Sequence, residues 1–295
     1  MLDYRGAASA RIVAVMRRRQ WIEIADQPWC PAAVRDGLTD YLQFVVDRTA
    51  PYAAAVPLLT DALRASDRRA GPASALAASA VRDVVDLGAG AGGPWRALAF
   101  ELAAAGMPVR VRLTDAYPNL AAFSRFALET QGAVTGEPRP VAADAVPADL
   151  MGFRTCFSAF HHFPPPLARR VLADARARGE GIAVFEATRR DARCLLFMLV
   201  VPVLILLVTP VLRPFRWSRL LLTYVLPVIP LAALVDGVVS CLRTYTPDEL
   251  RALAAPTHGA EAAWDYGWTA GESGTGPIPM TYLIGYPTSP SSRVA

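Results

Sequence analysis

The feature that most constrains the fold is a run of glycines directly after an apolar segment, where residues 84–95 read VVDLGAGAGGPW. The apolar residues at its start predict a buried strand, and the residues after Pro94 predict a helix. Glycines between a strand and a helix let the backbone turn tightly and approach a ligand, while the helix N-terminus offers free N–H groups to an anion. The chain is therefore expected to bind a ligand at a strand–turn–helix unit.

Short β-branched segments alternate with helical ones around this motif. Such alternation predicts an α/β fold with a parallel, doubly wound sheet. We expect strands at 82–87, 109–114, 138–142, 154–159 and 181–186, and helices at 95–105, 118–131 and 165–178.

The end of the chain predicts one more helix and two closing strands. Thr246, Pro247 and Glu249 have the spacing of a capping box that begins a helix. The segments 262–268 and 280–287 are expected to form an antiparallel pair.

The chain divides into three predicted parts. Residues 1–80 form an N-terminal helical cap, with helices near 7–20, 32–48 and 52–65 and a linker at 68–79. Residues 81–193 and 244–295 form the ligand-binding domain, and residues 194–243 form a hydrophobic helical hairpin inserted after the fifth strand.

The glycine spacing leaves two cofactors open. Gly88, Gly90 and Gly93 satisfy the dinucleotide pattern G-x-G-x-x-G, and Asp115 follows Gly93 by 22 residues, near the position of a ribose-binding acid. An NAD(P)-dependent oxidoreductase is therefore one interpretation.

The second interpretation comes from a resemblance. The segment DLGAGAG at 86–92 resembles the first motif of class I S-adenosylmethionine (SAM)-dependent methyltransferases. A helical region before the first strand, AADAV after the third strand and a final strand pair match the order of that family. The resemblance covers residues 81–190 and 244–286, and it implies a Rossmann-like fold, SAM as cofactor and methyl transfer as the activity.

The resemblance also implies roles for individual residues. Gly88, Gly90 and Gly92 would form the cofactor loop, with Asp86 near the amino acid moiety of SAM. Asp115 would accept hydrogen bonds from the ribose hydroxyls. Asp144 would lie beside the adenine amine, or it is a plain loop carboxylate.

The segment FSAFHHFPP, at the end of the fourth strand, holds the predicted catalytic residues, because ligands bind there in open α/β sheets. Methyltransferases that resemble this chain carry a histidine pair at this place. His161 or His162 could deprotonate an acceptor, since imidazole titrates near neutral pH, and Glu186 is the second candidate base. The alternatives are a packed or turn-capping histidine, and an ion pair of Glu186 with Arg189 or Arg190.

The insertion begins with nineteen uncharged residues, 194–212, which would span about 28 Å as a helix. A second apolar run occupies 220–239. Two membrane spans would place Arg213, Arg216 and Arg219 outside, against the positive-inside tendency. A hairpin lying in the membrane surface, two spans and a lid over an apolar pocket all stay open, and each indicates an apolar acceptor.

Substrate contacts are predicted from two sets of residues. Asp236, Ser240 and Arg243 form a polar stripe on an apolar helix, and they either pair with one another or contact a polar head of the acceptor. Trp29 and Tyr41 either line a pocket or belong to the core.

Composition excludes other classes of function. The net charge is +4 and the basic run is only Arg17–Arg19, so nucleic acid is not an expected partner. The four cysteines are scattered, which argues against a zinc site or a disulfide framework, and no metal is expected. The N-terminus lacks the pattern of a secretory signal, so we expect a membrane-associated protein with its methyltransferase domain on the cytoplasmic side.

The predicted function is SAM-dependent methyl transfer to a hydrophobic or lipid-like small molecule at the membrane. A nicotinamide-dependent oxidoreductase and a membrane-tethered SAM-binding protein without methyl transfer are the alternatives.

Overall fold

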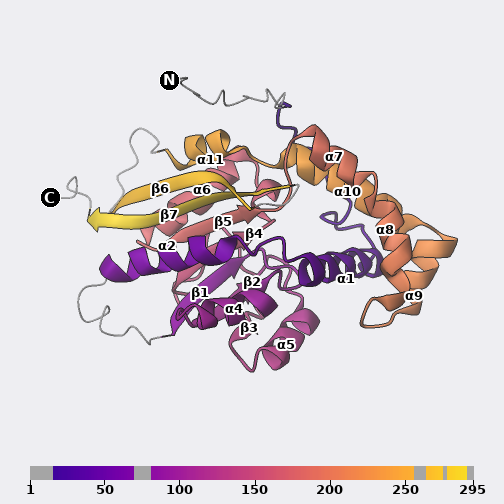
Figure 1. Cartoon of the computed structure of the whole chain (residues 1–295), viewed down its shortest axis with the longest axis horizontal. Helices are drawn as coiled ribbons and strands as arrows, with labels where there is room; N and C mark the ends of the chain where they lie inside the picture. Colours follow the sequence, from indigo (N-terminus) through magenta and orange to yellow (C-terminus); the bar gives the residue numbers. More distant parts are fainter. Residues whose placement is uncertain (1–15, 70–80, 256–263, 275–277, 291–295) are drawn as a thin grey trace, which may run out of the picture.

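The computed structural model describes residues 16–69, 81–255, 264–274 and 278–290 and contains a seven-stranded sheet (Figure 1). The strand order is β3-β2-β1-β4-β5-β7-β6. The strands are β1 (Arg82–Leu87), β2 (Val109–Thr114), β3 (Val134–Gly136), β4 (Phe153–Phe157), β5 (Ile182–Glu186), β6 (Trp264–Ser273) and β7 (Met280–Pro290).

The direction of the last strands distinguishes this sheet from the usual dinucleotide-binding sheet. Strands β1 to β5 are parallel, whereas β7 pairs antiparallel with both β5 and β6. The usual dinucleotide sheet has the order 3-2-1-4-5-6. Here β7 lies between β5 and β6, so the predicted closing pair is confirmed and is also built into the sheet.

Helices cover both faces of the sheet because the central strands are apolar on both faces. In β5, Ala183 and Phe185 join one core, while Ile182 and Val184 join the other, as the alternation of side chains along a strand requires. The first core also takes in α2 (Ala55–Arg69), α4 (Trp95–Ala104) and α5 (Leu120–Glu129), and the second takes in α6 (Pro165–Ala177) and α11 (Pro247–Ala254).

A third core joins the N-terminal helix α1 (Ala32–Thr49) to the insertion. Leu38 and Tyr41 of α1 are buried there with Ile205 and Ile229. Gly37 lets the two helices approach, since a Cβ at this position would lie 2.5 Å from Ile229 Cδ1. The insertion therefore packs on α1 beside the sheet (Figure 1).

Prolines divide the insertion into short helices. Its elements are α7 (Ala192–Met198), α8 (Val201–Val208), η2 (Thr209–Val211), α9 (Trp217–Leu220), η3 (Leu221–Val225) and α10 (Val228–Arg243). The run Ala192–Val211 is long and apolar enough to cross a membrane, and 28% of its most apolar window is buried. The second run, Trp217–Val225 with Val228–Arg243, bends by 79° at its break.

Two sequence predictions of structure need correction. The third strand was predicted at 138–142 but lies at Val134–Gly136, because Pro138 and Pro140 have no N–H to donate to a neighbouring strand. The helix predicted near 7–20 falls mostly outside the described residues, and 16–20 is not helical. The other predicted helices and strands are present within a few residues of their predicted bounds, and the capping box of Thr246 and Glu249 is formed.

Candidate functional site

The loop between β1 and α4 has the geometry that the glycines predicted. Gly90 has a φ of 54°, and a Cβ built there would meet nothing within 4 Å. Gly92 has a φ of 112°, and its Cβ would lie 2.5 Å from the ring of Phe126. Gly90 thus leaves space for a ligand, whereas Gly92 is required by packing between the loop and α5.

Asp115, directly after β2, bridges this loop to the next one. Its Oδ2 accepts a hydrogen bond from the Gly90 N–H at 2.9 Å, and its Oδ1 accepts one from the Tyr117 N–H at 2.8 Å. The sheet therefore brings Asp115 and the glycine loop together at the carboxyl ends of two adjacent strands, where a ribose could bridge them.

Asp86 is 1% exposed at the end of β1 and accepts a hydrogen bond from the Thr155 hydroxyl at 2.6 Å. Burial raises the pKa of this carboxyl to about 7. A buried carboxyl that titrates near neutral pH can take up or release a proton when a charged ligand group binds beside it.

His161 and Glu186 form a buried pair at the ends of β4 and β5. The Nδ1 of His161 lies 2.7 Å from Glu186 Oε2, and Glu186 Oε1 accepts a hydrogen bond from the His161 N–H at 3.0 Å. The side chains are 3% and 1% exposed. The alternative ion pairs of Glu186 are not formed, because Arg189 bonds Asp191 and Glu272, and Arg190 bonds Glu249.

His162 lies against His161, with ring centroids 4.3 Å apart. Its Nδ1 is 2.9 Å from Asp26 Oδ2. Burial lowers the pKa of His162, but the hydrogen bond to Asp26 and the charge of Glu23 outweigh it, so the pKa lies above its usual value. Each histidine thus has a carboxylate partner at Nδ1.

Glu23 and Asp26 were not anticipated from the sequence, although they complete this cluster. Glu23 Oε1 lies 3.7 Å from His161 Nε2, and Glu23 Oε2 lies 3.7 Å from His162 Nε2. Both acids belong to WIEIADQPW, a segment without regular secondary structure. No helical or strand periodicity in the sequence therefore indicated that they face the site.

The polar stripe of α10 contacts the same N-terminal segment. Asp236 accepts hydrogen bonds from the Ile24 and Ala25 N–H groups at 2.6 and 3.0 Å. Ser240 donates to Glu23 at 3.0 Å, and Arg243 pairs with Glu23 at 2.9 Å. The Asp236–Arg243 pair considered from the sequence is not formed, since each side chain has partners in residues 23–26.

The remaining predicted residues lie apart from this cluster. Asp144 pairs with Arg170 of α6 at 2.8 Å. Tyr41 is buried in the core between α1 and the insertion, whereas Trp29 is 69% exposed.

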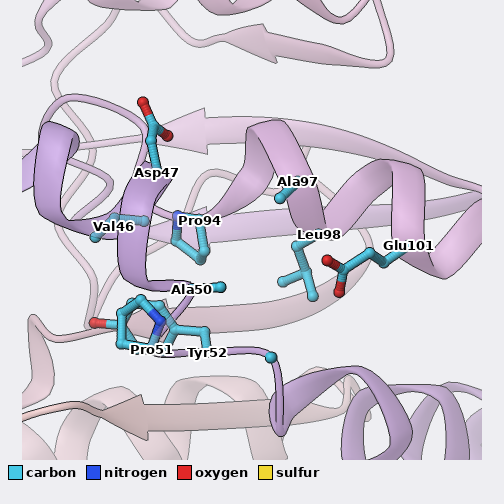
Figure 2. A pocket seen from close by; sticks show the side chains of 10 residues that line it. Val46, Asp47, Ala50, Pro51, Tyr52, Pro94, Ala97, Leu98 and Glu101 are labelled. Atoms are coloured by element: carbon cyan, nitrogen blue, oxygen red, sulfur yellow. The ribbon is translucent and has the colours of Figure 1, made fainter.

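Two pockets flank the glycine loop. The pocket in Figure 2 lies between the end of α1 and α4, with Tyr52, Pro94 and Leu98 in its wall, and it contains none of the predicted site residues. The second is lined by Ala91 of the loop, Asp40 of α1, Arg216 of the insertion and the start of α5. The insertion therefore borders the space beside the glycine loop.

Comparisons with known proteins give structural matches only. No protein-family model matches the sequence, and no curated protein matches it significantly. Among solved structures, a protein from Rhodobacter sphaeroides described as a Zn-dependent alcohol dehydrogenase matches 72% of this chain and 87% of its own, at 14% identity and a TM-score of 0.44.

Two further matches are similarly distant. An O-methyltransferase assigned in Nostoc punctiforme matches 86% of this chain and 72% of its own, at 14% identity and a TM-score of 0.41. LepI in complex with SAM matches 70% of this chain at 18% identity and a TM-score of 0.40, and this chain spans 43% of that one.

The strand order, the antiparallel β7 and the glycine loop after β1 define the class I SAM-dependent methyltransferase fold, as the resemblance predicted. To this fold the chain adds the helical insertion between β5 and α11, held to the sheet domain through α1.

Proposed function

We propose that this protein transfers a methyl group from SAM to a hydrophobic or lipid-like small molecule at a membrane surface. The observation that carries the proposal is the pairing of Asp115 with the Gly90 N–H beside open space at the glycine loop. A ribose diol can replace the N–H as the partner of this carboxylate, and among the described residues nothing lies within 4 Å of a Cβ built at Gly90.

Positioning is the main contribution that such a reaction asks of the protein. The methyl group passes in line from the sulfonium to the acceptor, and well-oriented reactants gain about 7 to 11 kcal/mol. A base at His161, His162 or Glu186 is needed only for an acceptor that must lose a proton, and this role stays a prediction.

The exposed side chains of the insertion support a membrane surface as the place of reaction. Leu207, Trp217 and Val225 are 70%, 77% and 69% exposed. Exposed apolar patches of this kind mark surfaces that bind a protein or a membrane. Further exposed apolar residues lie in the same insertion: Leu196, Phe197, Leu199, Val200, Val203, Val211, Leu221, Leu226, Leu231 and Val235.

Contacts with α1 favour a hairpin in the membrane surface over two spans. Arg219, which is 2% exposed, bonds Asp40 at 2.6 Å, and Arg216 bonds Asp36 at 3.2 Å. One turn after Asp40, α1 is held to the sheet domain by the hydrogen bond from Gln43 to the Gly93 carbonyl. Two crossings would separate the tip of the hairpin from these partners and leave buried charges unpaired.

The cofactor and the reaction can be tested in one assay series. Calorimetry with SAM and with NAD should show binding of SAM alone, and incubation with radiolabelled SAM and a host lipid extract should label a lipid-soluble product. Binding of NAD instead of SAM would support the oxidoreductase, while SAM binding without any labelled product would support a SAM-binding protein tethered to the membrane.

Membrane binding is best tested with single charged substitutions. Deleting the whole insertion would expose the face of α1 that packs against it. Leu207→Glu and Val225→Glu should each reduce cosedimentation with anionic phospholipid vesicles, since a charge cannot enter the acyl region cheaply. The matched controls are Phe100→Glu on α4 and Leu128→Glu on α5, which change side chains that are 77% and 81% exposed on the sheet domain. Equal binding by all four variants would contradict the proposed membrane face.

A further inference from the structure

The two histidines and Glu23 direct three ligand atoms at one another. His161, His162 and Glu23 each offer one possible ligand atom, a ring nitrogen or a carboxylate oxygen, and these three atoms lie within 4.8 Å of one another. We propose that these residues form a binding site for a divalent transition metal of the zinc type. Two histidines and one glutamate are a ligand set that proteins use for zinc with one position left open.

The distances suit a metal better than direct hydrogen bonds. His161 Nε2 lies 3.7 Å from Oε1 of Glu23, and His162 Nε2 lies 3.7 Å from Oε2, and both distances are too long for a hydrogen bond. Metal–ligand bonds of about 2.1 Å at a tetrahedral angle would separate nitrogen and oxygen by about 3.4 Å. A small inward shift of these side chains would therefore complete the coordination.

The Nε2 of His161 is the atom that most needs a partner. The His161 side chain is 3% exposed, and its Nε2 has no hydrogen-bond partner among the described residues. A buried polar atom without a partner costs about 1 to 3 kcal/mol, so a native protein normally satisfies it. A metal at this point would accept the Nε2 lone pair.

Both histidine rings are held by carboxylates at Nδ1, the arrangement in which Nε2 can bind a metal. Glu186 lies at 2.7 Å from Nδ1 of His161, and Asp26 lies at 2.9 Å from Nδ1 of His162. A carboxylate that accepts the Nδ1 proton fixes the ring orientation and leaves the Nε2 lone pair for the metal. This arrangement occurs on both rings, which a cluster of histidines packed only for stability does not require.

The surrounding charge also favours a divalent cation. Three carboxylates and one guanidinium group belong to the cluster or contact it: Glu23, Asp26, Glu186 and Arg243. The formal excess of two negative charges matches the charge of the ion. Arg243 and Ser240 bond Oε1 of Glu23, so Oε2, the oxygen 3.7 Å from His162 Nε2, keeps lone pairs for the metal.

The ion could be reached from solvent beside His162, whose side chain is 30% exposed. A role in the reaction rests on the proposed methyl transfer. In that reaction, the open coordination position of the ion would take an oxygen of the acceptor. His161 and His162 would then hold a metal rather than remove a proton. Metal binding itself needs neither SAM nor acceptor, so it can be tested independently.

The test is calorimetric titration of chelator-treated protein with Zn²⁺ alone. The wild-type chain should bind one ion, and Glu23→Gln, His161→Ala and His162→Ala should each weaken binding at least a hundredfold. Asp26→Asn should weaken it ten- to a hundredfold, because it removes only the carboxylate that orients His162. Circular dichroism of each variant checks that it is folded, and His162, being partly exposed, is the substitution least costly to the fold.

Two controls separate this site from other zinc ligands. Glu137→Gln changes a carboxylate that is 6% exposed and bonded to an arginine, as Glu23 is, but lies beyond β3. Cys194→Ser with Cys241→Ser removes two buried thiols that lie 3.0 Å apart. Both proteins should bind Zn²⁺ as the wild type does. Absence of binding at micromolar Zn²⁺, binding retained in the histidine and glutamate variants, or loss in the cysteine variant would each overturn the proposal.

Discussion

The titration of Asp86 gives a prediction that the structure quantifies. The carboxyl is 1% exposed, and burial raises its pKa to about 7, compared with about 3.9 in an unfolded chain. The folded state therefore holds this proton more tightly than the unfolded state between pH 4 and pH 7. The contribution of Asp86 to stability is accordingly greatest below pH 4 and is lost as the pH rises towards 7.

The size of the effect follows from the shift. Three pKa units at about 1.4 kcal/mol each give a loss of up to about 4 kcal/mol above pH 7. Asp86→Asn removes the ionisation and keeps an oxygen to accept the Thr155 hydrogen bond. The variant should thus be close to the wild type in stability at pH 4.5, and more stable than it by a few kcal/mol at pH 8.

Denaturant unfolding of the two proteins at several pH values measures this difference, and subtraction cancels the groups that they share. Asp83→Asn, which removes a half-exposed carboxylate from the same strand, is the control and should change stability by less than about 1 kcal/mol at every pH. A gap between Asp86→Asn and the wild type that stays constant from pH 4.5 to pH 8 would refute the reasoning.

Three further outcomes are expected. Asp115→Ala should weaken SAM binding by roughly ten- to a hundredfold in calorimetry, because it removes a charged hydrogen-bond acceptor from the glycine loop; unchanged affinity would contradict the ribose assignment. Gly92→Ala should lower the unfolding free energy more than Gly90→Ala, because a Cβ at position 92 meets the ring of Phe126. Gly90→Ala should cost only about 1 to 2 kcal/mol of backbone strain, but it should weaken SAM binding. Equal thermal stability of the two variants would show that the Phe126 ring moves aside at little cost. Asp40→Ala should destabilise the protein by about 3 to 5 kcal/mol in denaturant unfolding, since it leaves the buried Arg219 unpaired; a loss below 1 kcal/mol would show that water reaches this arginine.

The sheet could be predicted because its signals are local. Alternating strands and helices, together with the glycines after Asp86, specify the order of the elements, and parallel strands with helical connections allow few topologies. The third strand was misplaced because only Val134 and Thr135 mark this short edge strand, and the apolar Val141 nearby suggested the wrong position.

The candidate site was predictable only in part because much of it comes from long-range contacts. Asp86, Gly90, Asp115 and the histidine pair follow strand ends, where sequence position alone indicates the functional edge. Glu23 reaches the histidines from a segment without regular structure, 138 residues before His161. The sequence predicted a polar contact for Asp236. Helical spacing could not predict that its partners are the backbone N–H groups of Ile24 and Ala25.

Helix α1 determines how this protein could be recombined with others. It buries Leu38 and Tyr41 against the insertion, and its Gln43 bonds the glycine loop. An exchange that transplanted residues 192–243 alone into another protein of this fold would leave Arg219 without Asp40 and the recipient without a surface to receive the helices. The smallest unit that evolution or a protein engineer could move intact therefore consists of two stretches, 16–49 and 192–243, which are far apart in the sequence and have to be inherited together.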